Sequence, residues 1–170
     1  VLIFEHKKLY CAKGIRKVEG ALDASSEIPE GDYTIPEGSA RIVREGRDVT
    51  ILANLRMVYE SKFAADELEQ EGIDVEIIDP RWLMPFDYDT LYASVRKTGR
   101  LVIVHEDTVT GGWGAEIAAR TMNDIFDYLD APVKRVCAPD TPAPFSPPLE
   151  DVYVPGKERI KQAVRAVCYR

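Results

Sequence analysis

The residue types best suited to chemistry gather in one stretch of the chain that begins at His105. His105 is followed by Glu106 and Asp107, and a histidine beside a carboxylate is a pairing used in general base catalysis. Neighbouring residues of a β-strand point to opposite faces, so His105 and Glu106 serve one pocket only if the strand has already broken. We therefore favour a structural or interface histidine over a general base. His6 has the same two interpretations.

A glycine-rich turn, Gly111-Gly112-Trp113-Gly114, follows this stretch and precedes a helical pattern. A phosphate could bind to the free N–H groups at such a helix start. The dinucleotide pattern G-x-G-x-x-G would need a small residue at Ile117, and the carboxylates just before the turn oppose phosphate. We favour a tight turn whose glycines allow close packing on a neighbour, with Trp113 as a contact residue.

Three aspartates, Asp124, Asp127 and Asp130, recur at every third position near the end of that helical pattern. Such a charge run usually marks a solvated helical face. The alternative is an anionic docking patch for a basic partner, because carboxylates at a helix C-terminus oppose the helix dipole and so suggest another use.

The elements that must position these residues alternate from Asp48 onward between short apolar runs and helical patterns. This order is typical of βαβ units that form a largely parallel sheet. The uninterrupted apolar run at 101–104 favours a central strand that is buried on both faces. We expect strands at Val49–Asn54, Ile73–Asp79, Leu101–Glu106 and Val133–Cys137.

Helical periodicity lies between these strands, and its ends can be identified. The first helix carries an apolar stripe from Met57 to Leu68 and ends at Gly72. Asp87 should cap the second helix, which Gly99 ends. The third begins near Gly114 and should bury an apolar face, and a last helix follows Pro155. The apolar face of the third comprises Ile117, Ala118, Met122, Ile125 and Leu129.

Two stretches look irregular. Cys11 to Gly38 is rich in Gly, Ser, Glu and Pro, and its length favours an interdomain connector. Ala138 to Pro155 holds six of the eleven prolines, which predicts a stiff, extended strap over a surface. Ala40 to Arg44 is a further short strand, and local rules alone would pair it as a hairpin with Val49–Asn54.

Composition narrows the function classes. The chain has 170 residues, a formal net charge of −7 and 45% hydrophobic residues, which is typical of a globular domain with a tail. We expect no nucleic-acid binding, because no basic footprint is present, and no membrane insertion, because no apolar run approaches about 20 residues. Three widely spaced cysteines favour a reducing compartment. The apolar start at Val1 suggests the middle of a longer protein.

Taken together, the motifs resemble the β subunit of thiamine-diphosphate-dependent 2-oxo acid dehydrogenases. The resemblance follows the whole chain in order and covers the C-terminal half of that subunit. It rests on Glu5-His6-Lys7-Lys8-Leu9-Tyr10, Tyr33-Thr34-Ile35-Pro36, Arg44-Glu45-Gly46, Asp48-Val49-Thr50-Ile51, Glu71-Gly72-Ile73-Asp74-Val75-Glu76, Lys97-Thr98-Gly99-Arg100-Leu101-Val102, Gly111-Gly112-Trp113-Gly114-Ala115-Glu116-Ile117 and Ala138-Pro139-Asp140-Thr141-Pro142.

This resemblance implies an α/β fold of three layers, α/β/α, with a mostly parallel five-stranded sheet of the transketolase C-terminal-domain type. Its first short strand would be antiparallel and would not pair with its sequence neighbour, against the local hairpin rule. Residues 1–10 would hold the last strand of a truncated pyrimidine-binding domain, residues 11–38 the connector, and residues 39–170 the C-terminal-like domain. Leu55 stands where relatives usually have glycine, so a positive φ there would strain this chain.

The resemblance also implies an α₂β₂ component that decarboxylates a 2-oxo acid oxidatively on thiamine diphosphate and passes the acyl group to a lipoyl group. Thiamine diphosphate, Mg²⁺ and the catalytic histidine would lie on the α subunit and on the missing half of β. We therefore expect no catalytic, cofactor-binding or metal-binding residue in this chain, and a cytoplasmic location, or the mitochondrial matrix in a eukaryote.

The resemblance thus implies that this chain serves assembly. Its partners would be the α subunit, a second β subunit and the basic peripheral subunit-binding domain of the lipoyl acyltransferase. The candidates for subunit contacts are His105, Glu106, Gly112 and Trp113, and those for acyltransferase docking are Asp127, Asp130 and the terminal Arg170. An alternative is an independent α/β enzyme or ligand-binding domain. Its crevice would lie at the strand ends, between residues 54–57 and 106–114.

Overall fold

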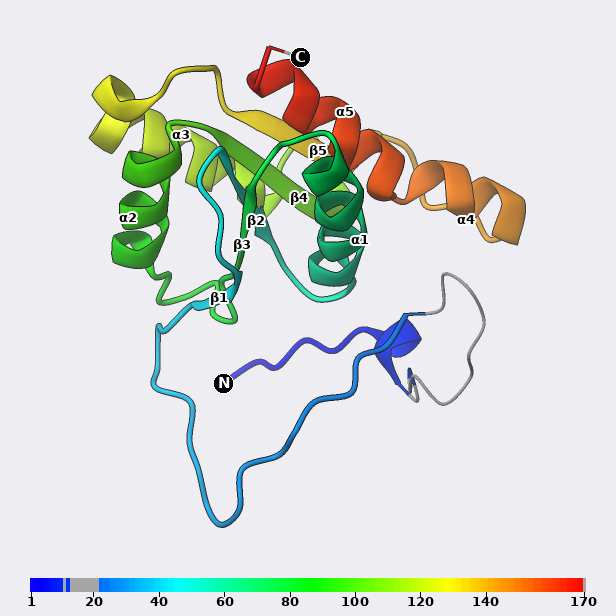
Figure 1. Cartoon of the computed structure of the whole chain (residues 1–170). Coiled ribbons are helices and arrows are strands. Elements are labelled where there is room, and N and C mark those ends of the chain that lie inside the picture. Colours follow the sequence, from blue (N-terminus) through cyan, green and yellow to red (C-terminus); the bar gives the residue numbers. More distant parts are fainter. Residues whose placement is uncertain (11, 13–21, 170) are drawn as a thin grey trace.

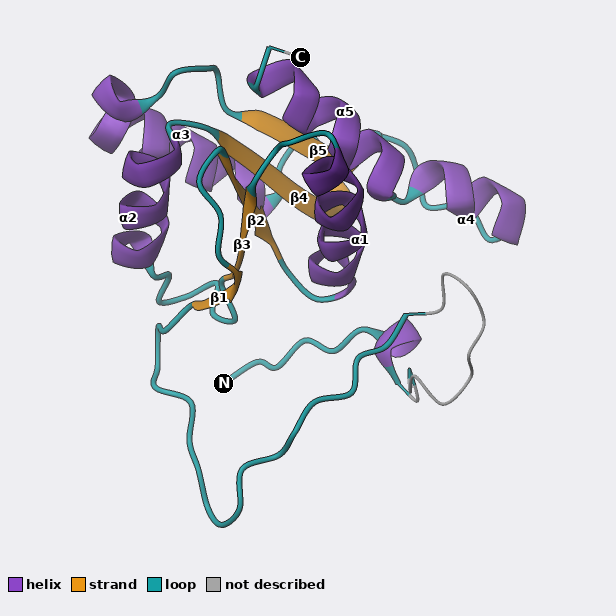
Figure 2. Cartoon of the chain, viewed as in Figure 1, coloured by secondary structure: helices purple, strands orange, loops and turns teal. Residues whose placement is uncertain are grey.

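A five-stranded sheet forms the centre of the molecule in the computed structural model, which describes residues 1–10, 12 and 22–169. The strands run in the order β1-β3-β2-β4-β5, and only β1 is antiparallel to its neighbour. This is the mostly parallel α/β sheet that the resemblance implied (Figures 1 and 2). The strands are β1 (Arg41–Arg44), β2 (Val49–Ala53), β3 (Val75–Asp79), β4 (Leu101–Thr108) and β5 (Lys134–Ala138).

Strand β1 pairs with β3, with Arg41 opposite Asp79, so the local hairpin prediction was wrong. Strand β2 pairs with β3 on one edge and with β4 on the other, so it has no free edge for a hairpin partner. The turn after β1 packs on β3 instead. A Cβ on Gly46 would lie 2.2 Å from the carbonyl carbon of Val75, and the Gly46 N–H donates to Glu76 Oε2 at 3.3 Å. Glycine is therefore required there, because the chain crosses β3 at backbone contact.

Helices cover both faces of the sheet and make the three layers (Figure 1). One hydrophobic cluster joins the sheet to α1 and α5, and a second joins it to α2 and α3. The helices are α1 (Arg56–Gln70), α2 (Tyr88–Thr98), α3 (Trp113–Ile125), α4 (Pro147–Tyr153) and α5 (Lys157–Val167), with short 3₁₀ turns η1 (Lys7–Leu9) and η2 (Phe126–Tyr128).

The helix ends mostly follow the sequence signals. Gly72 has a φ of 75° just beyond α1, and Gly99 ends α2 in the left-handed region. Asp87 caps α2 by accepting from the Thr90 N–H at 3.0 Å. The third helix is shorter than its pattern indicated, because the chain tightens into η2 after Ile125. Met122, which we expected to be buried, is 40% exposed as a result of its position on the outer side of α3.

The proline-rich segment 138–155 is only partly the extended strap that we expected. Its residues 147–153 form α4, with both prolines of Ser146-Pro147-Pro148 in the first turn or just before it. Proline is compatible with a helix start, since the N–H groups of the first turn have no partner within the helix. The remainder is irregular and contains no strand beyond Ala138.

The described N-terminal residues lie outside the α/β body. Residues 1–6 have no strand partner, and their first four side chains are exposed. The segment 22–38 loops away from the body (Figure 1). The division at residues 10 and 38 stays a prediction, and Cys11 is outside the described residues. Among the residues that the structure describes, no helix has the length and apolar character needed to cross a membrane.

Candidate functional site

His105 lies on β4 and points into the molecule, where its side chain is 1% exposed. Its Nε2 lies 3.4 Å from the Cys137 Sγ on the neighbouring strand β5. The Trp113 ring at the start of α3 lies 5.2 Å away, centroid to centroid, in a tilted arrangement. The Nδ1 atom has no hydrogen-bond partner in the part of the chain that the structure describes. His105 is thus a packing residue between a strand and a helix.

The two glycines beside Trp113 are needed for this packing. A Cβ on Gly112 would lie 2.6 Å from His105 Cε1, and a Cβ on Gly114 would lie 2.6 Å from His105 Nε2. Real Cβ contacts are not this short, so each substitution would move the imidazole. The interpretation of the turn as one that allows close approach to a neighbour is confirmed, and the neighbours are His105 and, for Gly112, also the Thr108 carbonyl oxygen, at 2.4 Å from the added Cβ. The ring fills the space beneath the start of α3.

Burial keeps this cluster uncharged. It lowers the pKa of His105 below its ordinary value, although the carboxylate of Asp107 acts in the opposite direction. Burial also raises the pKa of the Cys137 thiol, with the Arg135 and Arg159 guanidiniums opposing it. A neutral imidazole beside a neutral thiol suits packing. A reactive cysteine would instead need an electropositive, partly exposed setting.

Glu106 points to the opposite side of β4, as strand alternation requires. Its carboxylate Oε2 lies 2.8 Å from His6 Nε2, and the Nδ1 of the same ring accepts from the Lys8 N–H at 3.1 Å. His105 and Glu106 therefore do not form a pair, because His105 lies inside the body and Glu106 contacts His6 at its surface. The contact fixes the N-terminal segment to the end of β4. Sequence patterns gave no signal for it.

The three aspartates near the end of α3 have different surroundings. Asp124 accepts from the Tyr92 hydroxyl at 2.7 Å, and this bond lowers the pKa of the carboxyl group. Asp130 faces Arg100, with 3.7 Å between Oδ2 and Nη2, and its backbone carbonyl accepts from the Tyr169 hydroxyl. Asp127 is exposed on η2. The three carboxylates are not on one helical face, because the α-helix has ended at Ile125. Arg170 lies outside the described residues.

The strand-end crevice of the alternative hypothesis is flanked by strained backbone. Leu55, at the end of β2, has φ 50° and ψ −127°, a conformation that suits glycine alone. Arg56 beside it is paired with Glu60 at 3.0 Å, and Met57 is buried in the core. The side chains of residues 56 and 57 are thus engaged within the chain. The suspected positive φ at Leu55 is confirmed.

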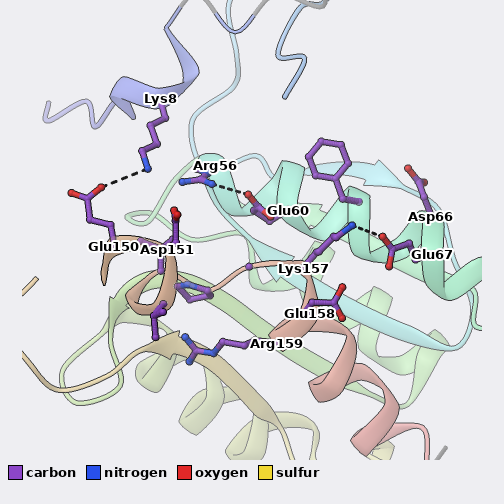
Figure 3. Close-up of a pocket in the computed structure, with 15 residues that line it drawn as sticks. Lys8, Arg56, Glu60, Asp66, Glu67, Glu150, Asp151, Lys157, Glu158 and Arg159 are labelled. Atoms are coloured by element: carbon purple, nitrogen blue, oxygen red, sulfur yellow. Dashed lines mark hydrogen bonds and ion pairs between the residues drawn. The ribbon is translucent and has the colours of Figure 1, made fainter. Parts of the chain in front are cut away.

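A groove of about 730 Å³ lies elsewhere, between α1, α4, the start of α5 and the N-terminal turn η1 (Figure 3). Its walls combine apolar and charged side chains. Sequence reasoning missed it, because its lining comes from three stretches that are far apart in the chain, at residue 8, residues 56–67 and residues 150–159. The lining residues are Lys8, Arg56, Glu60, Phe63, Asp66, Glu67, Glu150, Asp151, Val152, Val154, Pro155, Gly156, Lys157, Glu158 and Arg159.

Comparison with known proteins identifies the family. Residues 38–160 match the family described as the transketolase C-terminal domain. The chain is 43% identical over 165 residues to the acetoin:2,6-dichlorophenolindophenol oxidoreductase subunit beta of Cupriavidus necator, covering 97% of this chain and 45% of the relative. It is 46% identical over 148 residues to the pyruvate dehydrogenase E1 component subunit beta of Rhizobium meliloti, covering 86% and 32%.

A solved structure agrees with this match. It is a split-gene transketolase, an inactive β4 tetramer, that is 29% identical and superposes with a TM-score of 0.71, covering 88% of this chain and 47% of that one. The chain spans less than half the length of each of these relatives. The chain belongs to the transketolase C-terminal domain family, and its relatives include β subunits of pyruvate dehydrogenase and of acetoin oxidoreductase.

Proposed function

We propose that this chain is the C-terminal assembly domain of the β subunit of a 2-oxo acid dehydrogenase, within the component that decarboxylates the 2-oxo acid and transfers the acyl group to lipoyl. One observation carries the assembly role. The α/β body is complete, yet the N-terminal third leaves large apolar side chains in solvent. Exposed apolar groups of this number mark a surface that is covered in the assembled protein, by the other half of the β subunit or by a partner subunit. They include Leu2, Ile3, Phe4, Ile28, Tyr33 and Ile35.

We place the cofactors of such an enzyme outside this chain. In the described part of the chain, no group of three or more His, Cys, Asp or Glu residues is arranged to hold a metal ion such as Mg²⁺. The glycine turn that could bind a phosphate has a second use, because Gly112 and Gly114 let the His105 ring pack against it. Thiamine diphosphate and Mg²⁺ therefore belong, in this proposal, to the α subunit and the other half of β. No chemical step is assigned to residues of this chain.

The proposed partners are the α subunit, a second β subunit and the basic peripheral subunit-binding domain of the acyltransferase. Glu106 and Trp113 are partly exposed and remain proposed subunit contacts, whereas His105 and Gly112 are buried in their own fold and would act by holding that surface in shape. Asp127 is the more available docking carboxylate, since Asp130 already faces Arg100. The cytoplasm, or the mitochondrial matrix of a eukaryote, is the proposed location.

Complementation tests this function. The 170-residue chain is mixed with the separately produced N-terminal half of a related β subunit and with its α subunit, and 2-oxo-acid-dependent reduction of a dye is measured. We expect activity only in the ternary mixture. Calorimetry of the 170-residue chain alone with thiamine diphosphate and Mg²⁺ should show no micromolar binding. Micromolar binding, or a ternary mixture that neither assembles nor reduces the dye, would contradict the proposal.

A further inference from the structure

The groove beside α1 combines apolar walls with carboxylates at both ends. Val152 on α4 is 76% exposed, and it lines the groove together with Phe63, Val154 and Pro155. The volume of about 730 Å³ is within the range of about 300–1,000 Å³ that is common for binding sites. The groove can therefore take several side chains of an incoming segment.

The charges of the groove are unevenly satisfied. Arg56 is paired with Glu60 at 3.0 Å and Lys157 with Glu67 at 2.5 Å, while Arg159 donates to the Tyr153 carbonyl. Six carboxylates line the groove against four cations, and Lys161 beside the groove pairs with two of them, Glu67 and Glu158. Asp66 on α1 and Asp151 on α4 have no ion-pair partner among the described residues, and Figure 3 shows them toward opposite ends of the groove. The negative charge that is available to a ligand therefore lies at Asp66 and Asp151.

The chain already places one cation at the mouth of this groove. Lys8 reaches it from η1, outside the α/β body, and its Nζ lies 3.9 Å from Glu150 Oε2 (Figure 3). The Lys8 side chain remains 53% exposed, so the contact is loose and can be exchanged. This contact shows that the groove can bind the cation of a lysine that comes from a distant part of the sequence.

We propose that this groove binds a segment of a partner polypeptide in which lysine or arginine alternates with apolar residues. The apolar side chains would pack on Phe63 and Val152, and the cations would pair with Asp66 at one end and with Glu150 and Asp151 at the other. Lys8 holds the Glu150 end until the partner displaces it. None of the residues that line the groove is a proposed docking or subunit contact, so its occupancy does not depend on those contacts.

Fluorescence anisotropy on the 170-residue chain tests this. The probe is a labelled peptide of alternating lysine and leucine, and its counterpart has glutamate in place of lysine. The lysine peptide should bind, and 0.5 M salt should weaken it. Asp66→Asn with Asp151→Asn should weaken binding about 3- to 10-fold. Glu27→Gln with Asp32→Asn removes the same charge from the exposed segment at 22–38 and should have little effect.

Lys8 provides a second test with the opposite sign. Lys8→Ala frees the Glu150 end and should tighten binding of the lysine peptide about 2-fold. Lys7→Ala removes the same charge from a neighbouring residue that is not a lining residue of the groove, and should change binding less. Equal binding of the glutamate peptide, or equal losses in the groove and connector variants, would overturn the proposal. So would an effect of Lys8→Ala no larger than that of Lys7→Ala.

Discussion

Leu55 is the residue at which glycine should be most clearly preferred to alanine. It is the N-cap of α1, and at φ 50° and ψ −127° its Cβ crowds the backbone, a strain of about 1–3 kcal/mol. Leu55→Gly removes that strain. Two effects oppose the gain, a more flexible unfolded chain, about 0.5–1 kcal/mol, and the loss of a half-buried leucine, about 1 kcal/mol. Leu55→Ala loses the leucine but keeps the strain, so the glycine variant should be more stable than the alanine variant by about 1–2 kcal/mol.

Urea unfolding followed by the fluorescence of Trp82 and Trp113 measures this difference. Glycine is favoured over alanine at an N-cap even without strain, by up to about 1 kcal/mol. Gly156 supplies the control, because it is the N-cap of α5 with φ −111° and an added Cβ there would meet open space. The glycine advantage at position 55 should exceed that at position 156. Equal advantages would refute the strain argument.

Three further predictions concern the body of the domain. The folded-state pKa of His105 lies below its unfolded value of about 6.5, so the neutral ring stabilises the fold above that pH and this stabilisation is lost as the pH falls. The urea midpoint of unfolding should therefore fall more between pH 7.5 and pH 5 for the wild type than for His105→Gln. Gly114→Ala should destabilise by about 1–3 kcal/mol in chemical denaturation, because the new Cβ meets the His105 ring. Gly156→Ala places its Cβ in open space and should cost no more than the N-cap preference of up to about 1 kcal/mol. Lys97→Ala leaves the fully buried Glu76 side chain without its cation and should lower the free energy of unfolding by about 2 kcal/mol. Adding Glu76→Gln to the same chain should restore part of that loss. An unchanged midpoint of thermal unfolding in Lys97→Ala would show that Glu76 is protonated.

The parts of the fold that were predictable from sequence depend on short-range signals. Periodicity located the strands, and Asp87 and Gly99 located the ends of α2, because capping and left-handed backbone are decided within a few residues. The partner of β1 was not predictable in this way. It depends on the contact of Gly46 with Val75, which lies about 30 residues away in the chain.

The candidate site was predictable to a smaller extent. Strand alternation correctly separated His105 from Glu106, and the glycine turn correctly indicated close packing. The partner of Glu106 is His6, and no pattern joins positions a hundred residues apart in sequence. The groove was not predicted for the same reason, because its side chains come from three distant stretches of the chain. The family resemblance predicted the sheet topology that local signals missed, but it did not predict these surface contacts.

The sheet edge at β1 has a consequence for how the domain can associate. Only four residues long, β1 changes register between Ile42 and Arg44 and carries an arginine at each end. A short, charged and irregular edge strand is a poor template for a further strand. Sheet extension from one copy to the next, the usual route to β-aggregation, is therefore blocked at this side. Contacts with other chains are directed to side-chain surfaces, where partners can be distinguished by shape and charge.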